Sequence, residues 1–304
     1  VNAASYCPFY SRSFAKAGFR PDAMMSLEDF AGCPSLTKQD MQQHFNDLTS
    51  TEIADSQKLY ITTGGSTGVP VGFHLQKGVS RPKEQAFLEA NWRRVGYVDK
   101  ARLALIRGHV TDSRARDNII AHDATRNWLM LSSYHLTDER IPEYLEALEN
   151  FQPDFLNIYP SAALQLAEYL QRHDQRWRTP LQGVLCGSEQ LTLSQKRLLE
   201  GVFQCRVLRW YGHAERVVLA AEGTYSDLFY FWPHYGFVEF GEPDGDGLRE
   251  VIGTTFHNMA MPLVRYRTGD FVRLAKPDAR REYAWPAVEE IAGREQEFLV
   301  TGSG

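Results

Sequence analysis

Hydrophobic and polar positions follow two different periods along the middle of the chain. Short apolar runs predict buried strands, and longer segments with apolar residues every three or four positions predict amphipathic helices. The expected strands are residues 103–106, 154–159, 183–187 and 206–211, and the expected helices are residues 80–96, 139–151, 161–172 and 193–203. Strands separated by helices predict βαβ units and a mainly parallel sheet, with ligands at the carboxyl ends of its strands.

The pattern changes beyond residue 234. Short runs with a two-residue period stand there between Gly-, Pro- and Asp-rich turns, at residues 237–240, 248–256 and 271–274. This pattern favours an antiparallel, barrel-like part. We therefore expect an α/β fold whose large domain, residues 1–291, has three parts: an irregular, partly helical lead-in over 1–57, an α/β core over 58–233 and a β-rich part over 234–291.

Composition narrows the class of protein. The chain has 304 residues, 43% of them hydrophobic, and a formal net charge of −5, which offers no basic surface for nucleic acid or for an anionic membrane. There is no apolar run as long as a membrane span and no signal-peptide core at the N-terminus. Four scattered cysteines without metal-ligand spacing favour free thiols and a cytoplasmic location: Cys7, Cys33, Cys186 and Cys205.

The most informative stretch is Ile61-Thr62-Thr63-Gly64-Gly65-Ser66-Thr67-Gly68-Val69-Pro70, which lies between two β-type runs. Glycines allow backbone N–H groups to turn inward, and Ser and Thr hydroxyls add further donors. Such a loop suits an anion, above all a phosphate chain, although the same composition also fits a plain turn between strands. A Walker loop is excluded because no lysine stands where G-x-x-x-x-G-K-[ST] requires one.

The same loop also matches a hydrolase signature. Gly64 to Gly68 fits G-x-S-x-G, in which Ser66 would be the nucleophile, but that motif runs from a strand directly into a helix. Here Pro70 and the β-branched residues beside it favour an extended chain after the loop. A serine hydrolase using Ser66 is therefore the weaker alternative.

Three further motifs follow the loop in a fixed order: Tyr211-Gly212-His213-Ala214-Glu215, Tyr266-Arg267-Thr268-Gly269-Asp270 and Gly293-Arg294. Each alone has an ordinary explanation as a helix-start carboxylate, a turn or a solvated charge. Together and in this order they resemble the core motifs of adenylate-forming enzymes, the superfamily of acyl- and aryl-coenzyme A synthetases. Residues 157–161, 184–191 and 261–270 look, more narrowly, like the phenylacetate–coenzyme A ligase branch, which includes ligases encoded with capsular-polysaccharide genes.

The resemblance implies roles for individual residues. The loop from Thr62 to Gly68 would hold the β- and γ-phosphates of ATP, and Glu215 would help to hold Mg²⁺, an ion that prefers one or two carboxylates plus phosphate oxygens. Asp270 would accept hydrogen bonds from both ribose hydroxyls, and Arg294 would bind near the ribose or the α-phosphate. The full set implied for ATP is Thr62, Thr63, Gly64, Gly65, Ser66, Thr67, Gly68, Gly187, Ser188, Glu189, Tyr211, Gly212, His213, Glu215, Asp270 and Arg294.

The acid substrate would face a second set of residues: Tyr134, His135, Tyr159 and Ser161. The residues implied in catalysis are Glu215, Thr63, Ser66, Thr67 and His135. Other strand ends, including Arg107 and His109, lie where a ligand of a parallel sheet is expected.

The implied activity joins a carboxylic acid to ATP, giving an acyl-adenylate and pyrophosphate, and then passes the acyl group to coenzyme A. Transfer to an amine, and a nucleotide-binding protein without catalysis, remain open. The expected partners are therefore a small carboxylic acid, ATP and coenzyme A, with a homodimer left open.

Two positions depart from the commonest family pattern. Pro70 is followed by Val71 instead of Lys, and Ala214 stands where a hydroxyl residue is common. Relatives also continue past the Gly-Arg motif through a hinge into a small C-terminal domain bearing a catalytic lysine. We therefore expect residues 292–304 to be a hinge and the stub of a C-terminal domain that is absent from this sequence.

Overall fold

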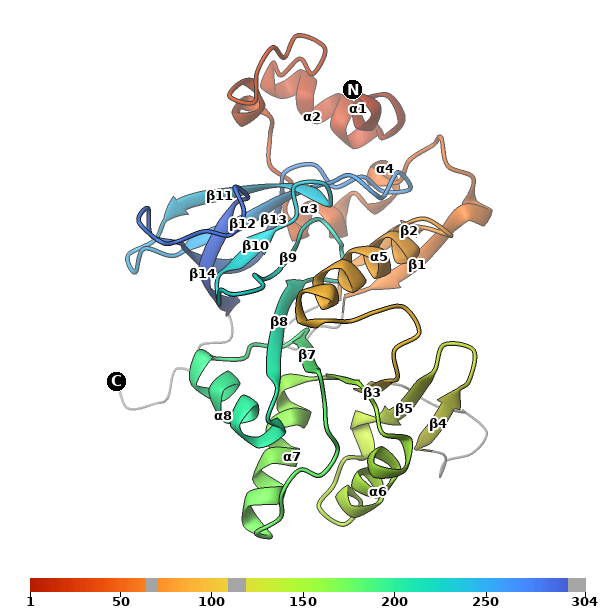
Figure 1. Cartoon of the computed structure of the whole chain (residues 1–304). Helices are drawn as coiled ribbons and strands as arrows, with labels where there is room; N and C mark the ends of the chain where they lie inside the picture. The colour runs from red at the N-terminus through yellow and green to blue at the C-terminus, as the bar shows by residue number, and fades with distance from the viewer. Residues whose placement is uncertain (64–69, 109–118, 295–304) are drawn as a thin grey trace, which may run out of the picture. The chain divides into compact units, whose positions relative to one another are not determined.

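The computed structural model describes residues 1–63, 70–108 and 119–294, and the chain forms two compact units (Figure 1). The first unit comprises residues 1–87, 212–220 and 226–304, and the second comprises residues 88–211 and 221–225. Within the described residues, none of the helices is both long and apolar enough to cross a membrane.

The second unit is built on a mainly parallel sheet, in the strand order β8-β7-β6-β3-β5-β4. Its strands are β3 (Leu103–Arg107), β4 (Ile120–Asp123), β5 (Trp128–Ser132), β6 (Phe155–Ile158), β7 (Gly183–Gly187) and β8 (Arg206–Gly212). Strand β3 pairs in parallel with β5 and β6, β6 with β7, and β7 with β8, whereas β4 runs antiparallel to β5. The predicted parallel sheet is therefore confirmed.

Helices cover one face of this sheet and a smaller apolar cluster covers the other. Because side chains alternate along a strand, Leu156, Val184 and Val207 pack with the helices α6 (Ile141–Phe151), α7 (Pro160–Arg172) and α8 (Leu193–Phe203), which lie together in Figure 1. The opposite face, here called the Trp92 face, carries Trp92, Tyr97, Leu103, Leu105, Phe155, Leu185 and Leu208. Two residues after Leu105, Phe155, Leu185 and Leu208, towards the carboxyl ends of the strands, the same face carries Arg107, Asn157, Gly187 and Trp210.

A buried ionic cluster fixes residues 221–225 to the second unit. Glu222, the last residue of β9 (Leu219–Glu222), accepts hydrogen bonds from Lys196 Nζ at 2.9 and 3.0 Å and from Arg209 Nε at 2.7 Å. The Arg209 backbone N–H also donates to Glu222, at 2.9 Å. Removing one partner of such a buried pair costs about 3–5 kcal/mol, because a charge is left buried without compensation.

The first unit contains a hairpin and an antiparallel set of strands. In the hairpin, β1 (Lys58–Thr62) pairs with β2 (Gly72–Gln76), and the other strands follow the order β11-β12-β13-β14-β10. Their bounds are β10 (Phe229–Phe231), β11 (Gly236–Pro243), β12 (Arg249–Thr255), β13 (Tyr266–Leu274) and β14 (Ala287–Arg294). The antiparallel pattern predicted beyond residue 234 is therefore confirmed.

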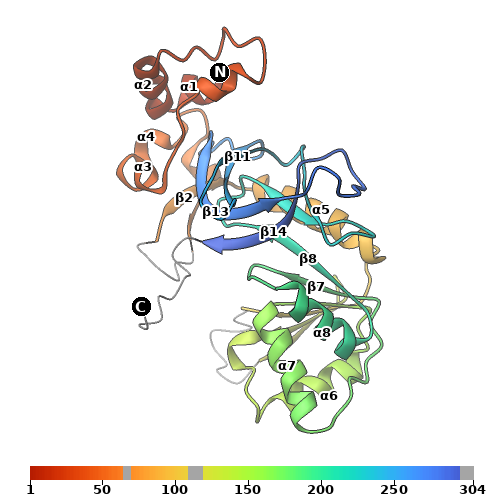
Figure 2. The same ribbon diagram turned by 90° about the vertical axis from the view of Figure 1, so that its left-hand side faces the viewer.

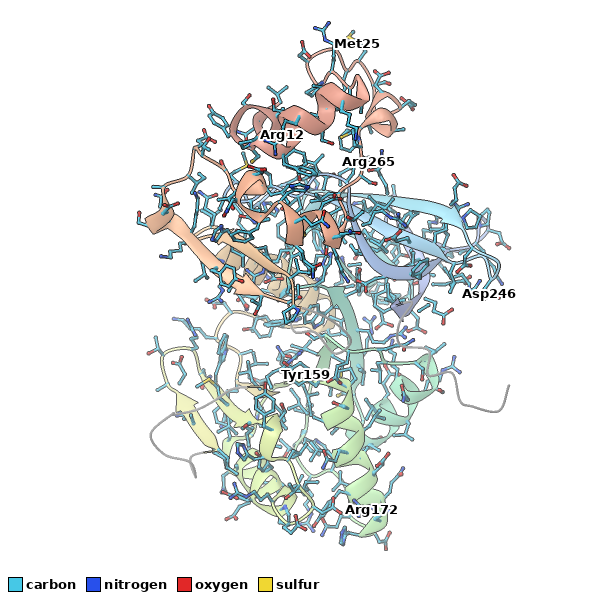
Figure 3. The ribbon with its side chains drawn as sticks, turned by 180° about the vertical axis from the view of Figure 1, so that it is seen from behind. Arg12, Met25, Tyr159, Arg172, Asp246 and Arg265 are labelled. Atoms are coloured by element: carbon cyan, nitrogen blue, oxygen red, sulfur yellow. The ribbon has the colours of Figure 1, made fainter. Side chains whose placement is uncertain are left out.

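The lead-in is helical in short pieces, as predicted. Its elements are α1 (Asn2–Tyr6), α2 (Pro8–Ala17), η1 (Asp29–Gly32), α3 (Lys38–Gln43), α4 (Phe45–Leu48) and η2 (Asp55–Gln57). Helix α3 contacts β2 and β13 (Figure 2). It begins with a capping box between Thr37 and Asp40. Arg265, labelled in Figure 3, donates to the carbonyl oxygens of Ala31 and Cys33, so it holds the lead-in against the start of β13.

Helix boundaries agree closely with the sequence pattern where helices and strands alternate. The predicted helix over 80–96 is α5 (Ser80–Trp92) followed by the turn η3 (Arg93–Val95), and 183–187 and 193–203 have the predicted bounds. Strands β4, β5, β9, β10 and β14 and the turn η4 (Ser133–His135) have no counterpart among the predicted elements.

Candidate functional site

The predicted phosphate loop joins the two strands of the hairpin. Thr62 pairs with Gly72 at its base, the Thr63 N–H donates to the Val71 carbonyl at 2.9 Å, and the Val71 N–H donates to the Thr63 hydroxyl at 3.0 Å. The remaining predicted residues, Gly64, Gly65, Ser66, Thr67 and Gly68, lie outside the described residues. Because a strand follows the loop, the strand-to-helix turn that a nucleophile elbow requires is not formed here.

Glu215 is a buried carboxylate in which one oxygen accepts a hydrogen bond and the other has no partner among the described residues. It is 2% exposed and lies in a turn closed by the Arg216 N–H donating to the His213 carbonyl, directly after β8. The Tyr266 hydroxyl, at the start of β13, donates to Glu215 Oε1 at 2.8 Å. Oε2 is buried and has no hydrogen-bond partner among the described residues.

An unpaired buried carboxylate oxygen is costly, so its position calls for a ligand. A divalent cation is a fitting one, since Mg²⁺ takes one or two protein carboxylates and completes its shell with phosphate oxygens and water. Across residues 1–63, 70–108 and 119–294, His, Cys, Asp and Glu side chains gather nowhere in threes as an all-protein metal site would need. Glu215 therefore fits a metal that is bound together with a phosphate-bearing substrate.

Arg216 ties this turn to the rest of the first unit. Its backbone has a φ of 55°, and its guanidinium forms an ion pair with Glu84 of α5 at 2.7 Å. The turn that carries Glu215 is therefore held by two adjacent residues, Glu215 through the Tyr266 hydroxyl and Arg216 through Glu84.

Asp270 is held by a bulge in β13. The pairing of β12 with β13 shifts between Glu250 and Ile252, and Gly269 takes a φ of 74°, which a residue without Cβ adopts at little cost. The Asp270 N–H donates to the Thr268 hydroxyl at 3.0 Å, and Asp270 pairs across the sheet with Arg294 of β14. The structure thus places the backbones of these two predicted ribose and phosphate residues side by side.

In the second unit, Gly187, Ser188 and Glu189 form the turn after β7. A Cβ on Gly187 would overlap the Trp210 indole ring, so only glycine fits there. Ser188 has a φ of 74°, a conformation that costs about 1–3 kcal/mol in a residue other than glycine. The Ser161 N–H, in the first turn of α7, donates to Glu189 Oε2 at 2.8 Å, so Glu189 holds the start of that helix.

The predicted acid-facing residues also lie in the second unit. The Ser132 hydroxyl and His135 Nδ1 are 3.0 Å apart, and the Tyr144 hydroxyl donates to the Ser132 carbonyl at 2.7 Å. Tyr134 is 72% exposed, and its hydroxyl lies 2.7 Å from where a Cβ on Gly108 would be.

Arg107, which the sequence placed at a strand end where a ligand is expected, sits among these residues. Its guanidinium lies 4.4 Å from the centre of the Tyr159 ring, a cation–π contact worth about 0.5–2 kcal/mol (Tyr159 is labelled in Figure 3). It also donates to Asn157 Oδ1, to the Gly187 carbonyl and to the Ser188 hydroxyl. Burial lowers the pKa of the Arg107 guanidinium from its usual value, since it disfavours the charged form.

The predicted residues divide between the two units. Thr62, Thr63, Gly212, His213, Glu215, Asp270 and Arg294 belong to the first unit, and Tyr134, His135, Tyr159, Ser161, Gly187, Ser188, Glu189 and Tyr211 belong to the second. The first unit contains a carboxylate with a spare oxygen and a strand-held aspartate, and the second unit collects aromatic rings around a buried cation.

No family model matches the chain. By sequence it is 25% identical over 307 residues to a phenylacetate-coenzyme A ligase of Escherichia coli, covering 96% of this chain and 68% of that protein. It is 24% identical over 270 residues to protein CapK of Staphylococcus aureus, covering 88% of this chain and 59% of that protein. By sequence the chain is therefore similar to members of the adenylate-forming superfamily.

Solved structures of similar ligases share the fold of this chain. A 2-hydroxyisobutyryl-CoA ligase in the postadenylation state with 2-HIB-AMP matches with a TM-score of 0.73 at 19% identity, over 99% of this chain and 66% of that one. The open conformation of a 2-hydroxyisobutyryl-CoA ligase with 2-HIB-AMP and CoA matches with a TM-score of 0.71 at 18% identity. The chain thus spans between about three fifths and three quarters of the length of these relatives.

The sequence drew attention to Tyr266 and Arg107 but not to the partners that they have in the structure. Tyr266 was part of a recognised motif, but its hydroxyl partner Glu215 lies 51 residues away, so no spacing rule connects them. Arg107 was visible as a charged residue at the end of an apolar strand, which is the available signal for a site at the carboxyl edge of a sheet.

Proposed function

We propose that the protein is an acid–thiol ligase that activates a carboxylic acid with ATP and transfers the acyl group to coenzyme A. The carboxylate oxygen forms a bond to the α-phosphorus of ATP while the bond from that phosphorus to the bridging oxygen breaks, and pyrophosphate leaves. The thiol sulfur of coenzyme A then forms a bond to the acyl carbon, and AMP leaves. The observation that carries the proposal is the spare buried oxygen of Glu215, fixed by Tyr266 within two of the family motifs.

The chemistry explains why such a residue is needed. A carboxylate and a triphosphate are both anions, so protein groups contribute mainly by positioning and by compensating charge. Mg²⁺, when bound at Glu215, supplies positive charge to the phosphates. Glu215 itself presents one oxygen and is held by the Tyr266 hydroxyl, while Thr63 fixes the base of the phosphate loop through its contacts with Val71.

We assign the nucleoside and the acid to the other residues of the predicted set. Asp270 would accept hydrogen bonds from the ribose hydroxyls, and Arg294 would bind nearby. Tyr211, with Gly187, Ser188 and Glu189, would line the adenine. Tyr134, His135, Tyr159 and Ser161 would face the acid, in keeping with the grouping of Tyr134 and Tyr159 around residues 107 and 108.

The names of similar proteins support coenzyme A as the acceptor of the acyl group. The curated relatives include ligases named for phenylacetate and coenzyme A, and one of the similar solved structures contains an acyl-adenylate together with CoA. Coenzyme A is therefore the acceptor that we propose, in preference to an amine.

The deciding experiment measures acid-dependent exchange of pyrophosphate into ATP by the full-length protein, with a panel of aryl and acyl acids. Glu215→Gln should lower the exchange rate about a hundredfold or more, by analogy with the loss of one electrostatic contact to a transition state. Glu242→Gln, which changes an exposed carboxylate of β11, should leave the rate unchanged. ATP binding without exchange for any acid would instead favour a non-catalytic nucleotide-binding protein.

The ribose assignment has its own test. Asp270→Asn should weaken ATP binding by about 1.5–3 kcal/mol for each charged hydrogen bond lost. Asp246→Asn, at an exposed turn labelled in Figure 3, serves as the matched control and should bind ATP normally. An Asp270→Asn protein with unchanged nucleotide affinity would remove Asp270 from the site.

A further inference from the structure

A cluster of hydrogen-bond donors lies where four strands end on the Trp92 face of the second unit. Arg107 is the last residue of β3, Gly187 is the last residue of β7, and Trp210 stands opposite Gly187 in the neighbouring strand β8. The Arg107 guanidinium carbon is 5.8 Å from the centre of the Trp210 ring system. All of these groups belong to one unit, so their arrangement does not depend on the other.

The charge of Arg107 is held in place but not neutralised. Asn157 Oδ1 accepts from Nε at 2.8 Å and from Nη2 at 2.6 Å, and Nη1 donates to the Gly187 carbonyl at 3.1 Å and to the Ser188 hydroxyl at 3.3 Å. These acceptors are all neutral, and no carboxylate of the described residues forms an ion pair with Arg107. Four of the five guanidinium N–H groups serve these acceptors, and the Tyr159 side chain is a further hydrogen-bond partner of the guanidinium.

The second donor of the cluster is the indole N–H of Trp210. Nε1 is buried and has no hydrogen-bond partner among the described residues, and it lies beside the Cα of Gly187, whose carbonyl accepts from Arg107. An unpaired indole N–H alone would carry little weight, because Trp92 in the apolar cluster of the same face has one as well. At Trp210, however, it stands next to the guanidinium of Arg107, a residue that is 9% exposed and forms no ion pair among the described residues.

We propose that Arg107 and Trp210 recognise a second carboxylate on the acid substrate, so that the enzyme activates a dicarboxylic acid at one end and binds its other end here. This inference rests on the proposed function. The guanidinium charge, which has no ion-pair partner among the described residues, and the unpaired indole N–H match the single negative charge and the acceptor oxygens of a carboxylate. A phosphate, with a charge near −2 and three free oxygens, would need more donors than the cluster offers.

The group bound at Arg107 is the end that does not react. A carboxylate whose oxygen lone pairs are engaged by a guanidinium and an indole N–H is a poorer nucleophile toward phosphorus. Arg107 therefore acts as a specificity-determining residue for the distal end of the substrate.

The test compares dicarboxylic acids with their monoamides, which keep the length and shape but lose the second charge. Pyrophosphate exchange by the full-length protein is measured with succinate, glutarate, adipate, suberate and terephthalate, each against its monoamide. The dicarboxylate that gives the highest kcat/KM should exceed its monoamide about tenfold to a hundredfold, the value of a charge-assisted hydrogen bond. Highest kcat/KM for a monoamide or for another monocarboxylate, such as phenylacetate, would overturn the inference while leaving the proposed function intact.

Variants then connect this preference to the two residues. Arg107→Gln should reduce the ratio of dicarboxylate to monoamide to about one, and Arg107→Lys should restore part of it. Trp210→Phe should raise the KM of the dicarboxylate about threefold to tenfold, whereas Trp92→Phe, which also removes a buried unpaired indole N–H, should not. Equal losses for dicarboxylate and monoamide, with a lower melting temperature, would show that Arg107 only joins strand ends. Absence of exchange with every acid would instead refute the proposed function.

Discussion

The hydrogen bond from the Tyr266 hydroxyl to Glu215 can be measured through stability, independently of any substrate. Tyr266→Phe removes a 2.8 Å hydrogen bond to a carboxylate that is 2% exposed and leaves both carboxylate oxygens buried without that donor. A hydrogen bond to a charged group contributes about 1.5–3 kcal/mol. For a chain of 304 residues unfolding cooperatively, this corresponds to a fall in melting temperature of about 2–5 °C.

The matched control is Tyr230→Phe in the same unit. Tyr230 is equally buried, but its hydroxyl accepts a hydrogen bond of 3.0 Å from the neutral backbone N–H of Glu282, so the expected loss is only about 0.5–1.5 kcal/mol. Thermal and urea unfolding measure the loss in both tyrosine variants. A double-mutant cycle of Tyr266→Phe and Glu215→Gln then gives the coupling energy between Tyr266 and Glu215 directly. Equal losses in the two tyrosine variants, or no coupling between Tyr266 and Glu215, would refute a charged hydrogen bond here.

Three other changes test the second unit. Gly187→Ala should destabilise the protein by about 1–3 kcal/mol in urea unfolding, because its Cβ meets the Trp210 indole, and adding Trp210→Ala should recover part of the loss. Glu222→Gln should cost about 3–5 kcal/mol, since Lys196 and Arg209 lose a buried counter-charge; a cost near zero would mean that the cluster does not stabilise the fold. Burial raises the pKa of the Cys186 thiol to about 12, so this thiol stays protonated at pH 8; a disulfide exchange reagent should leave it unmodified until a denaturant is added, and rapid labelling of the native protein would contradict its burial.

The alternation of helices and strands in the second unit could be predicted because each element there has its own clear period. Residues 183–187 form an uninterrupted apolar run, and residues 193–203 carry leucines at helical spacing after a Thr192 capping box. The edge strand β4 was missed because it is short, half-buried and contains His122 and Asp123, which resemble loop residues. Strand β5 was missed although it is apolar, because a five-residue run does not distinguish a strand from a helix segment by period alone.

The sequence could predict which residues form the candidate site, but not which side chains and strands hold those residues in place. The motifs drew attention to Glu215 and Asp270, yet the hydroxyl that holds Glu215 comes from β13 and the bulge that holds Asp270 depends on the pairing with β12. Arg107 joins groups 50 and 80 residues away along the chain, so its role appears only when the parallel strands are placed in register.

The short return of residues 221–225 to the second unit has a consequence for how the polypeptide can be divided. The chain crosses from one unit to the other at 87/88, 211/212, 220/221 and 225/226, so no single cut separates two independent pieces. A fragment ending at Tyr211 would lack Glu222, and the ammonium of Lys196 and the guanidinium of Arg209 would face each other in the interior without their shared counterion. Each unit is therefore completed by sequence that lies beyond a segment of the other, which ties the folding of the second unit to translation of residues 212–220 of the first.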